Sequence, residues 1–184
     1  MKGWIEAVGY QAVWFAAVVG AARGSYVPGV AAALAFIACH LLWATRLRQE
    51  VLLIVAGFAC GLLVDGGLVR AGLVAFGASP ARFDVLGAPP WIFALWVCFA
   101  LTLSRSLAVL QHRPALAALL GAIGAPLAYA GASRGWDVVT FADPAWQSIA
   151  ALGLGWAIAL PVLALIARNG APPVRAAVVP GTPA

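Results

Sequence analysis

Charged residues are scarce in this chain. Of its 184 residues only 9% are charged, and 64% are hydrophobic, whereas soluble domains carry roughly 25% charged residues. A soluble fold of this length could not enclose so much apolar surface. The composition therefore excludes an ordinary soluble domain and predicts one compact membrane domain.

Residues that bind metals or form disulfides are also few. The three cysteines, Cys39, Cys60 and Cys98, lie singly in different apolar segments, so we interpret them as small buried apolar residues. The two histidines, His40 and His112, are too few for a multi-histidine metal site.

Sequence motifs for catalysis are absent as well. The chain has no His-Glu metal motif, nucleophile elbow, phosphate loop or dinucleotide fingerprint, and no basic run dense enough for nucleic acid. We therefore predict no metal, no cofactor and no nucleic-acid partner, and we expect a non-enzymatic protein rather than an enzyme.

What the sequence does contain is a series of apolar segments. They cover about 4–22, 28–44, 51–69 with a possible extension to 76, 90–110, 114–132 and 145–167. These lengths suit helices that cross a bilayer, and the segments lack the alternation of barrel strands. The prediction is an all-α, polytopic membrane protein: a bundle of about six transmembrane helices over residues 1–168. The Pro-rich tail, 169–184, is predicted to be disordered and cytoplasmic.

The basic residues indicate an orientation. Six spans place both termini on one side of the membrane. That side carries seven basic residues, which are Lys2, Arg46, Arg48, Arg105, Arg113, Arg168 and Arg175. The other side carries four, which are Arg23, Arg70, Arg82 and Arg134. The positive-inside rule therefore predicts that both termini are cytoplasmic.

The third apolar segment carries the most unusual polar residue. Gly57, Gly61 and Asp65 are spaced at i, i+4 and i+8 and share one helix face. The glycines allow close approach of another helix. A carboxylate at this depth should face protein or water, because a charge in hydrocarbon costs about 2.5–3.5 kcal/mol. We expect a basic partner from another element, with Arg134 favoured over Arg23, and leave a structural and a functional role open.

His40 and Arg105 are two of the polar residues within apolar segments that lie on the predicted cytoplasmic side. His40 fits a hydrogen-bonded helix end better than a proton relay. Arg105 fits snorkelling toward lipid headgroups better than ligand binding.

The fifth apolar segment has a pattern of small residues. They recur at spacings of four, three, four and three as Ala117, Gly121, Gly124, Ala128 and Gly131. The pattern predicts a helix face that packs closely against a neighbour. Pro126 in this segment and Pro161 in the next each free one helical carbonyl. Two kinked, packed helices are the favoured interpretation; two broken helices that line a substrate site are the alternative.

Three stretches carry a resemblance to a known family. They are residues 57–65, the segment Thr102-Leu103-Ser104-Arg105-Ser106-Leu107, and residues 121–129, which include Pro126 and Tyr129. Together they resemble domain of unknown function 2878, an uncharacterised family of bacterial inner-membrane proteins. Ala125 stands where a second glycine would be expected, and Arg105 where an asparagine would be. The resemblance covers about 4–167 and implies partnership with enzymes that modify membrane fatty acids.

The leading functional hypothesis is an accessory or scaffold protein for membrane-lipid modification, with the lipid bilayer and such enzymes as partners. A small lipid or solute carrier or flippase is the first alternative. A membrane-embedded lipid-modifying enzyme that uses Asp65, His40 and Arg105 is the second.

Overall fold

The computed structural model describes residues 2–78 and 87–169, and within this part the chain is almost wholly helical. The α-helices are α1 (Lys2–Ala22), α2 (Val27–Leu42), α3 (Leu47–Arg70), α4 (Pro90–Thr102), α5 (Pro114–Trp136) and α6 (Ala145–Asn169). They are joined by the short 3-10 helix η2 (Ala108–His112) and by two short strands, β1 (Val74–Phe76) and β2 (Val139–Phe141). The predicted all-α bundle is confirmed. The tail predicted to be disordered lies outside the described residues beyond Asn169.

Four of the described helices are long and apolar enough to cross a membrane. They are α1, α3, α5 and α6. Helix α2 has 16 residues and α4 has 13, which at 1.5 Å per residue gives lengths of roughly 24 and 20 Å, less than a hydrocarbon core of about 30 Å. The described residues thus form the expected six α-helices, of which four reach spanning length.

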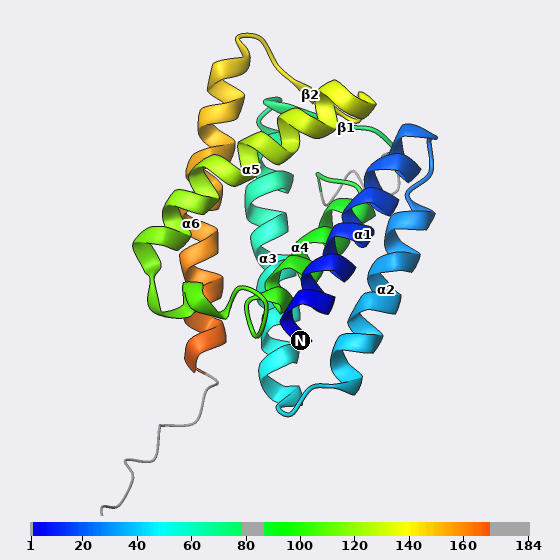
Figure 1. Ribbon diagram of the computed structural model, residues 1–184. Coiled ribbons are helices and arrows are strands. Elements are labelled where there is room, and N and C mark those ends of the chain that lie inside the picture. Colours follow the sequence, from blue (N-terminus) through cyan, green and yellow to red (C-terminus); the bar gives the residue numbers. More distant parts are fainter. Residues whose placement is uncertain (1, 79–86, 170–184) are drawn as a thin grey trace, which may run out of the picture.

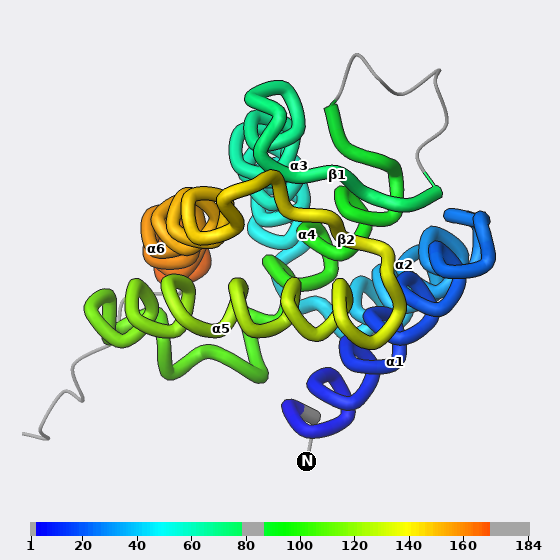
Figure 2. The backbone as a smooth tube through the Cα atoms, turned by 90° about the horizontal axis from the view of Figure 1, so that it is seen from above, coloured from blue at the N-terminus to red at the C-terminus, as the bar shows by residue number. Residues whose placement is uncertain are grey.

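Helix α4 is the central element of the bundle (Figure 1). It contacts α1, α2 and α3, and most of its residues are buried. Because it is surrounded by protein, it is apolar all round rather than amphipathic. Seen from above, α6 lies on one side of α3 and α4 and α2 on the other, and α5 runs across from α6 toward α1 (Figure 2).

The fourth predicted span is too long. The apolar pattern continues to Leu110, but α4 ends at Thr102 and is followed by turns and η2. In these turns, Glu6 of α1 accepts the backbone N–H of Ser106 at 3.0 Å, and Gln111 donates to the carbonyl of Leu103 at 2.7 Å. Side chains therefore satisfy backbone groups that a longer helix would satisfy itself, which is the condition for non-helical backbone in a membrane domain.

A small antiparallel sheet lies at the end of the bundle opposite the turns that follow α4 (Figure 1). It pairs β1 with β2, with Ala75 opposite Thr140. The two strands come from segments predicted as part of the third span or as loops, and α4 and α5 lie between them in the chain. Three-residue strands with one buried position give too little alternation to be recognised in the sequence.

Glycines set the closest helix contacts. A Cβ at Gly57 would lie 2.8 Å from the Cβ of Ala100, and one at Gly61 would lie 2.8 Å from the Trp96 ring. Both neighbours belong to α4. On the other side of the bundle, a Cβ at Gly121 of α5 would lie 2.3 Å from the backbone oxygen of Trp156 in α6. Helices α3 and α5 thus approach their neighbours more closely than any side chain at these positions would allow.

Pro126 and Pro161 both lie inside continuous helices, α5 and α6. The alternative of two broken helices is therefore wrong. The carbonyl of Ala122, which Pro126 leaves without its helical donor, lies against Gly153 of α6, where a Cβ would be 2.9 Å from the oxygen. Pro126 accordingly lies at a close contact between the two helices.

Candidate functional site

One buried polar cluster joins the ends of three helices. Glu6 of α1, His40 of α2 and Glu50 of α3 meet there, and all three are buried. His40 Nδ1 lies 2.6 Å from Glu6 Oε1. Its Nε2 lies 3.0 Å from Glu50 Oε2, at an ion-pair distance but without the alignment of a hydrogen bond. The imidazole therefore lies between two carboxylates.

The turn after α4 completes this cluster. Arg105 Nη1 lies 3.7 Å from Glu6 Oε1, and Arg105 Nη2 donates to the His40 carbonyl at 3.5 Å. The Ser106 hydroxyl lies 2.6 Å from Glu6 Oε2. Arg105 thus contacts protein groups instead of serving only as a snorkelling residue, and His40 is a hydrogen-bonded histidine near a helix end.

The arrangement of this cluster favours a structural clamp. The two carboxylates lie on opposite nitrogens of His40 and do not converge on a common point, and no group of metal-ligating side chains in the described residues could hold a metal ion. Each carboxylate instead faces the imidazole, which is a cation when protonated, and Glu6 also faces Arg105 from another element. The cluster ties α1, α2, α3 and the turn after α4 together at one end.

Asp65 forms a second, separate polar site. Its side chain is fully buried, and one oxygen, Oδ2, accepts two hydrogen bonds: one from Trp96 Nε1 of α4 at 2.6 Å and one from the Tyr129 hydroxyl of α5 at 2.6 Å. The other oxygen, Oδ1, has no hydrogen-bond partner among the described residues. Asp65 faces the bundle interior, as expected from the cost of exposing it to lipid.

The prediction of a basic partner for Asp65 is wrong. Arg134 is exposed near the end of α5, and the hydrogen bonds of Asp65 come from neutral aromatic donors. The reason is geometric. Because position 61 is glycine, α4 approaches α3 so closely that Trp96 lies directly against α3. Its indole N–H can therefore donate to the Asp65 carboxylate.

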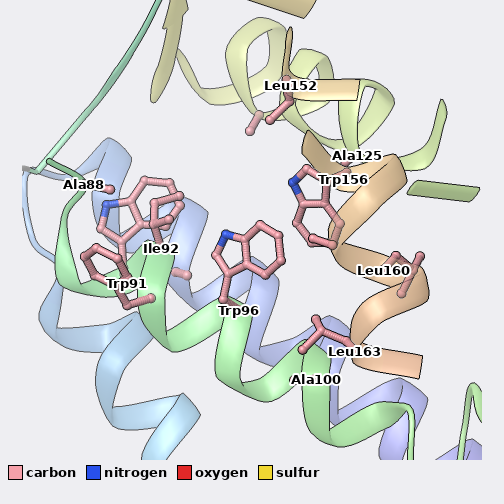
Figure 3. Close-up of a cluster of buried hydrophobic side chains, with 14 of the residues drawn as sticks. Ala88, Trp91, Ile92, Trp96, Ala100, Ala125, Leu152, Trp156, Leu160 and Leu163 are labelled. Atoms are coloured by element: carbon pink, nitrogen blue, oxygen red, sulfur yellow. The ribbon is translucent and has the colours of Figure 1, made fainter. Parts of the chain in front are cut away.

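Aromatic rings surround this second site. Trp96 stacks on Trp156 of α6 with ring centroids 3.9 Å apart, and Phe99 meets Trp156 edge to face at 5.2 Å. Figure 3 shows Trp96 and Trp156 facing one another from α4 and α6. Asp65 is therefore connected through Trp96 to the aromatic centre of the bundle.

A cavity lies next to these rings, between α1, α4, α5 and α6. Its volume is about 550 Å³, within the range of small-molecule pockets. Six aromatic residues line it: Tyr10, Trp14, Trp96, Phe99, Tyr129 and Trp156. Among the described residues, no charged side chain is part of the lining.

The cavity opens sideways between α1 and α5. These two helices meet through Trp136, whose ring lies 5.7 Å from that of Trp14 and 5.9 Å from that of Phe15. Away from this contact, Gln11 of α1 and Gly124 and Gly131 of α5 line the cavity and are exposed. Both helices are of membrane-spanning length, so the opening faces the region where lipid chains would lie.

A second hollow of about 480 Å³ lies between α3 and α6, and its lining is aliphatic. It includes Cys60, Leu63, Val64, Leu154 and Ile158, and no aromatic residue among those described. The two hollows are similar in size and differ in chemistry.

The small residues of α5, which were predicted to form one closely packed helix face, are divided between a packed face and an open face. Ala117 and Gly121 are buried, and Gly121 lies against α6. At Gly124 a Cβ would meet no atom within 4 Å, and the same holds for Gly131. The close packing expected at Gly124 is therefore absent, because a spacing of three and four does not show on which side of a helix the neighbour lies.

Several residues of both sites were not anticipated from the sequence. Glu6, Glu50 and Ser106 looked like charges and polar groups flanking apolar segments. Trp96 and Tyr129 looked like part of the general aromatic content. A usable signal exists only for Glu6, a carboxylate that lies inside the first apolar segment and therefore needs a partner.

The fold and these sites define a class: an all-α, polytopic bundle of membrane-protein type with a clamped end and an aromatic lateral cavity. The chain belongs to the family described as Protein of unknown function (DUF2878), whose sequence profile matches residues 3–162. Comparison with curated proteins found no match, and neither did comparison with solved structures. Asp65 and Tyr129, which are hydrogen-bonded to one another, come from two of the three stretches that carry the resemblance.

Proposed function

We propose that this protein binds the hydrocarbon chain of a single-chain amphiphile in the lateral cavity between α1 and α5. The observation that carries the proposal is a cavity of about 550 Å³ with an aromatic lining that opens between two helices of spanning length. Apolar walls with a few convergent polar groups are typical of ligand sites.

The contrast with the α3–α6 hollow supports this choice. An aliphatic hollow on the surface of a membrane protein can be filled by any lipid chain without selection. The α1–α5 cavity instead has the Tyr129 side chain in its wall, tied to the buried Asp65 at 2.6 Å. A buried carboxylate is costly in a membrane, and its position behind a cavity wall favours a binding role over simple helix association.

The proposal corresponds to the carrier alternative, or to an accessory protein that holds a chain for a lipid-modifying enzyme. It gives the cluster around His40 a structural role and assigns catalysis to no residue. Bound chains would exchange with the bilayer through the opening between α1 and α5.

Native mass spectrometry of the detergent-purified protein tests the proposal. A fatty alcohol and a fatty acid of one chain length are offered in parallel, and one bound chain per protein is expected from at least one of them. Gly124→Leu should fill the cavity without a steric clash, because a Cβ there meets no atom within 4 Å, and should weaken binding at least tenfold.

Two matched variants serve as controls. Gly135→Leu is the same substitution in α5 outside the cavity lining, and Gly67→Leu is its counterpart in the lining of the α3–α6 hollow. A Cβ at either position also meets nothing within 4 Å. Both should bind like the wild type. Unchanged binding in Gly124→Leu, or loss in Gly67→Leu, would contradict the proposed site.

We also propose that the protein lies in the bacterial inner membrane with both termini in the cytoplasm. The described chain begins and ends at the same end of the bundle (Figure 1), and the positive-inside rule favours the cytoplasm for that end. A cysteine placed in the link at 111–113 should be protected from a membrane-impermeant reagent in intact cells, and one beside Arg23 should be labelled. The reverse pattern would contradict the orientation.

A further inference from the structure

A polar side chain lies near the middle of α1, a helix of membrane-spanning length. Gln11 is close to the midpoint of this helix, which runs from Lys2 to Ala22. At 1.5 Å per residue it lies roughly 14 Å from one helix end and 16 Å from the other. Its side chain is exposed, and no hydrogen bond to it is found among the described residues. A carboxamide is thus exposed at the depth of the lipid chains.

A carboxamide at this depth is costly unless something binds it. An amide that leaves water without gaining a hydrogen bond raises the free energy of the state that holds it there. The backbone groups around Gln11 are bonded within α1 and do not compensate it. The structure therefore leaves Gln11 available for a group that the described chain does not supply.

Gln11 lies at the lateral opening of the α1–α5 cavity and forms part of its lining. On the α5 side of this opening, a Cβ at Gly124 or at Gly131 would meet no atom within 4 Å. On the surface of α1, Val8 and Phe15 lie next to Gln11 and are large, whereas close contacts between membrane helices use small residues. The surroundings of Gln11 therefore favour a bound molecule over a helix of a second copy.

The polar groups of the cavity lining are uncharged. Besides the Gln11 carboxamide they are the hydroxyl groups of Tyr10 and Tyr129 and the indole N–H groups of Trp14, Trp96 and Trp156. No Asp, Glu, Lys, Arg or His from the described residues lines the cavity. An ionised head would therefore find no opposite charge in this lining, at a depth where a charge is costly. A carboxamide both donates and accepts hydrogen bonds, so it can bind an uncharged head that does either.

We infer that Gln11 binds the polar head of the ligand in the lateral opening, near the middle of the bilayer, and that this head is uncharged. The ligand class is a hydrocarbon chain with a hydroxyl, carbonyl or similar head, and ionised amphiphiles are excluded. This inference rests on the proposed function and specifies a binding residue and the ligand class of that same cavity.

Four probes of one chain length test the inference: a fatty alcohol, the alkane, an alkyl trimethylammonium and an alkyl sulfonate. Each competes with an isotope-labelled fatty alcohol on the purified protein, and native mass spectrometry measures the bound label. The alcohol should bind about tenfold more tightly than the alkane, which corresponds to about one hydrogen bond. Both ionised probes should bind more weakly than the alcohol. The ammonium is the stricter test, because aromatic faces attract cations.

Gln11→Met tests the binding residue, because methionine is similar in length and lacks the amide. The variant should bind alcohol and alkane equally and keep the affinity of the wild type for the alkane. Gln147→Met is the matched control. Gln147 is an exposed residue of α6 outside the lining of both hollows, and this variant should keep the advantage of the alcohol. Gln11 is exposed without a partner in the described chain, so Gln11→Met should melt at or above the temperature of the wild type.

The outcomes separate this inference from the proposed function. Equal affinity of the wild type for alcohol and alkane would overturn the role of Gln11 and leave chain binding intact. An advantage of the alcohol that persists in Gln11→Met would place the head elsewhere and overturn it as well. Tight binding of an ionised probe would overturn the uncharged head. A dimer that Gln11→Met dissociates, with the preference for the alcohol unchanged, would assign Gln11 to a contact between copies. No binding of any probe would overturn both proposals.

Discussion

The two buried carboxylate sites of this bundle differ in what surrounds them. At the end of the bundle near the N-terminus, Glu6 and Glu50 lie against His40, which is a cation when protonated, and Glu6 also has Arg105 nearby. Further along α3, Asp65 is held by two neutral aromatic donors and lies behind the wall of a cavity. Both sites hold buried atoms without a hydrogen-bond partner among the described residues, His40 Nε2 and Glu50 Oε2 in the first and Asp65 Oδ1 in the second, but only the second site lies against the wall of a cavity. This difference is the basis for our proposal of a structural role for the first site and a binding role for the second.

The largest expected effect on stability comes from a larger side chain on the face of α5 that packs against α6. In Gly121→Leu the new Cβ would lie 2.3 Å from the backbone oxygen of Trp156, and a backbone atom cannot move away by changing rotamer. We expect destabilisation at or beyond about 3 kcal/mol, the upper end for overpacking. Gly124→Leu, three residues along the same helix, should change the melting temperature little.

These two variants test the division of α5 into a packed and an open face, which replaces the expectation that Gly124 packs tightly. Melting midpoints of both variants in one detergent measure the comparison. Equal midpoints would show that the cavity is as tightly filled as the α5–α6 contact, and would contradict the division of α5 into a packed face and an open face.

An intermediate effect is expected at the charged cluster. His40→Ala would leave Glu6 and Glu50 facing one another across a gap, with Arg105 as the remaining cation of the cluster. Breaking a fully buried ion pair costs about 3–5 kcal/mol; we expect about 2 kcal/mol here because the cluster lies near helix ends, where water can enter. His112→Ala, at an exposed position in η2, is the control and should be neutral. Thermal unfolding of both variants measures the difference, and a stable His40→Ala would refute the clamp.

The smallest effect on stability is expected at Asp65. In Asp65→Asn the amide oxygen can still accept hydrogen bonds from Trp96 and Tyr129, while its NH₂ group is left to find a partner. The cost should be about 1 kcal/mol, and chain binding in the cavity should change more than the fold does. Melting and chain binding are measured on the same sample. Parallel loss of both would make Asp65 a structural residue like His40.

The sequence predicts the helices well and their partners poorly. Every predicted apolar segment contains a helix with ends within a few residues, except the fourth, because hydrophobicity gives length and period directly. That segment is apolar to Leu110, yet the helix ends at Thr102 because Glu6, about a hundred residues away in the chain, satisfies the backbone of Ser106. Such a contact depends on how α1 packs and leaves no local pattern.

The same reasoning explains the candidate sites. Burial of Asp65 follows from the cost of a charge in hydrocarbon, so it could be predicted. Its partners could not, because a search for charges points to Arg134, whereas the close approach at Gly61 brings an indole donor within reach. The cavity was not predictable at all, since it depends on which face of α5 is turned toward α6.

The central claim is that the α1–α5 cavity, and not the α3–α6 hollow, holds a hydrocarbon chain. Photolabelling with a fatty alcohol that carries a diazirine in its chain, followed by peptide mapping, tests it most directly. We predict adducts within residues 10–14 of α1 and 120–131 of α5, lost in Gly124→Leu and kept in Gly135→Leu. Adducts confined to α3 and to residues 151–162 of α6, or equal labelling of both hollows that Gly124→Leu leaves unchanged, would contradict the claim.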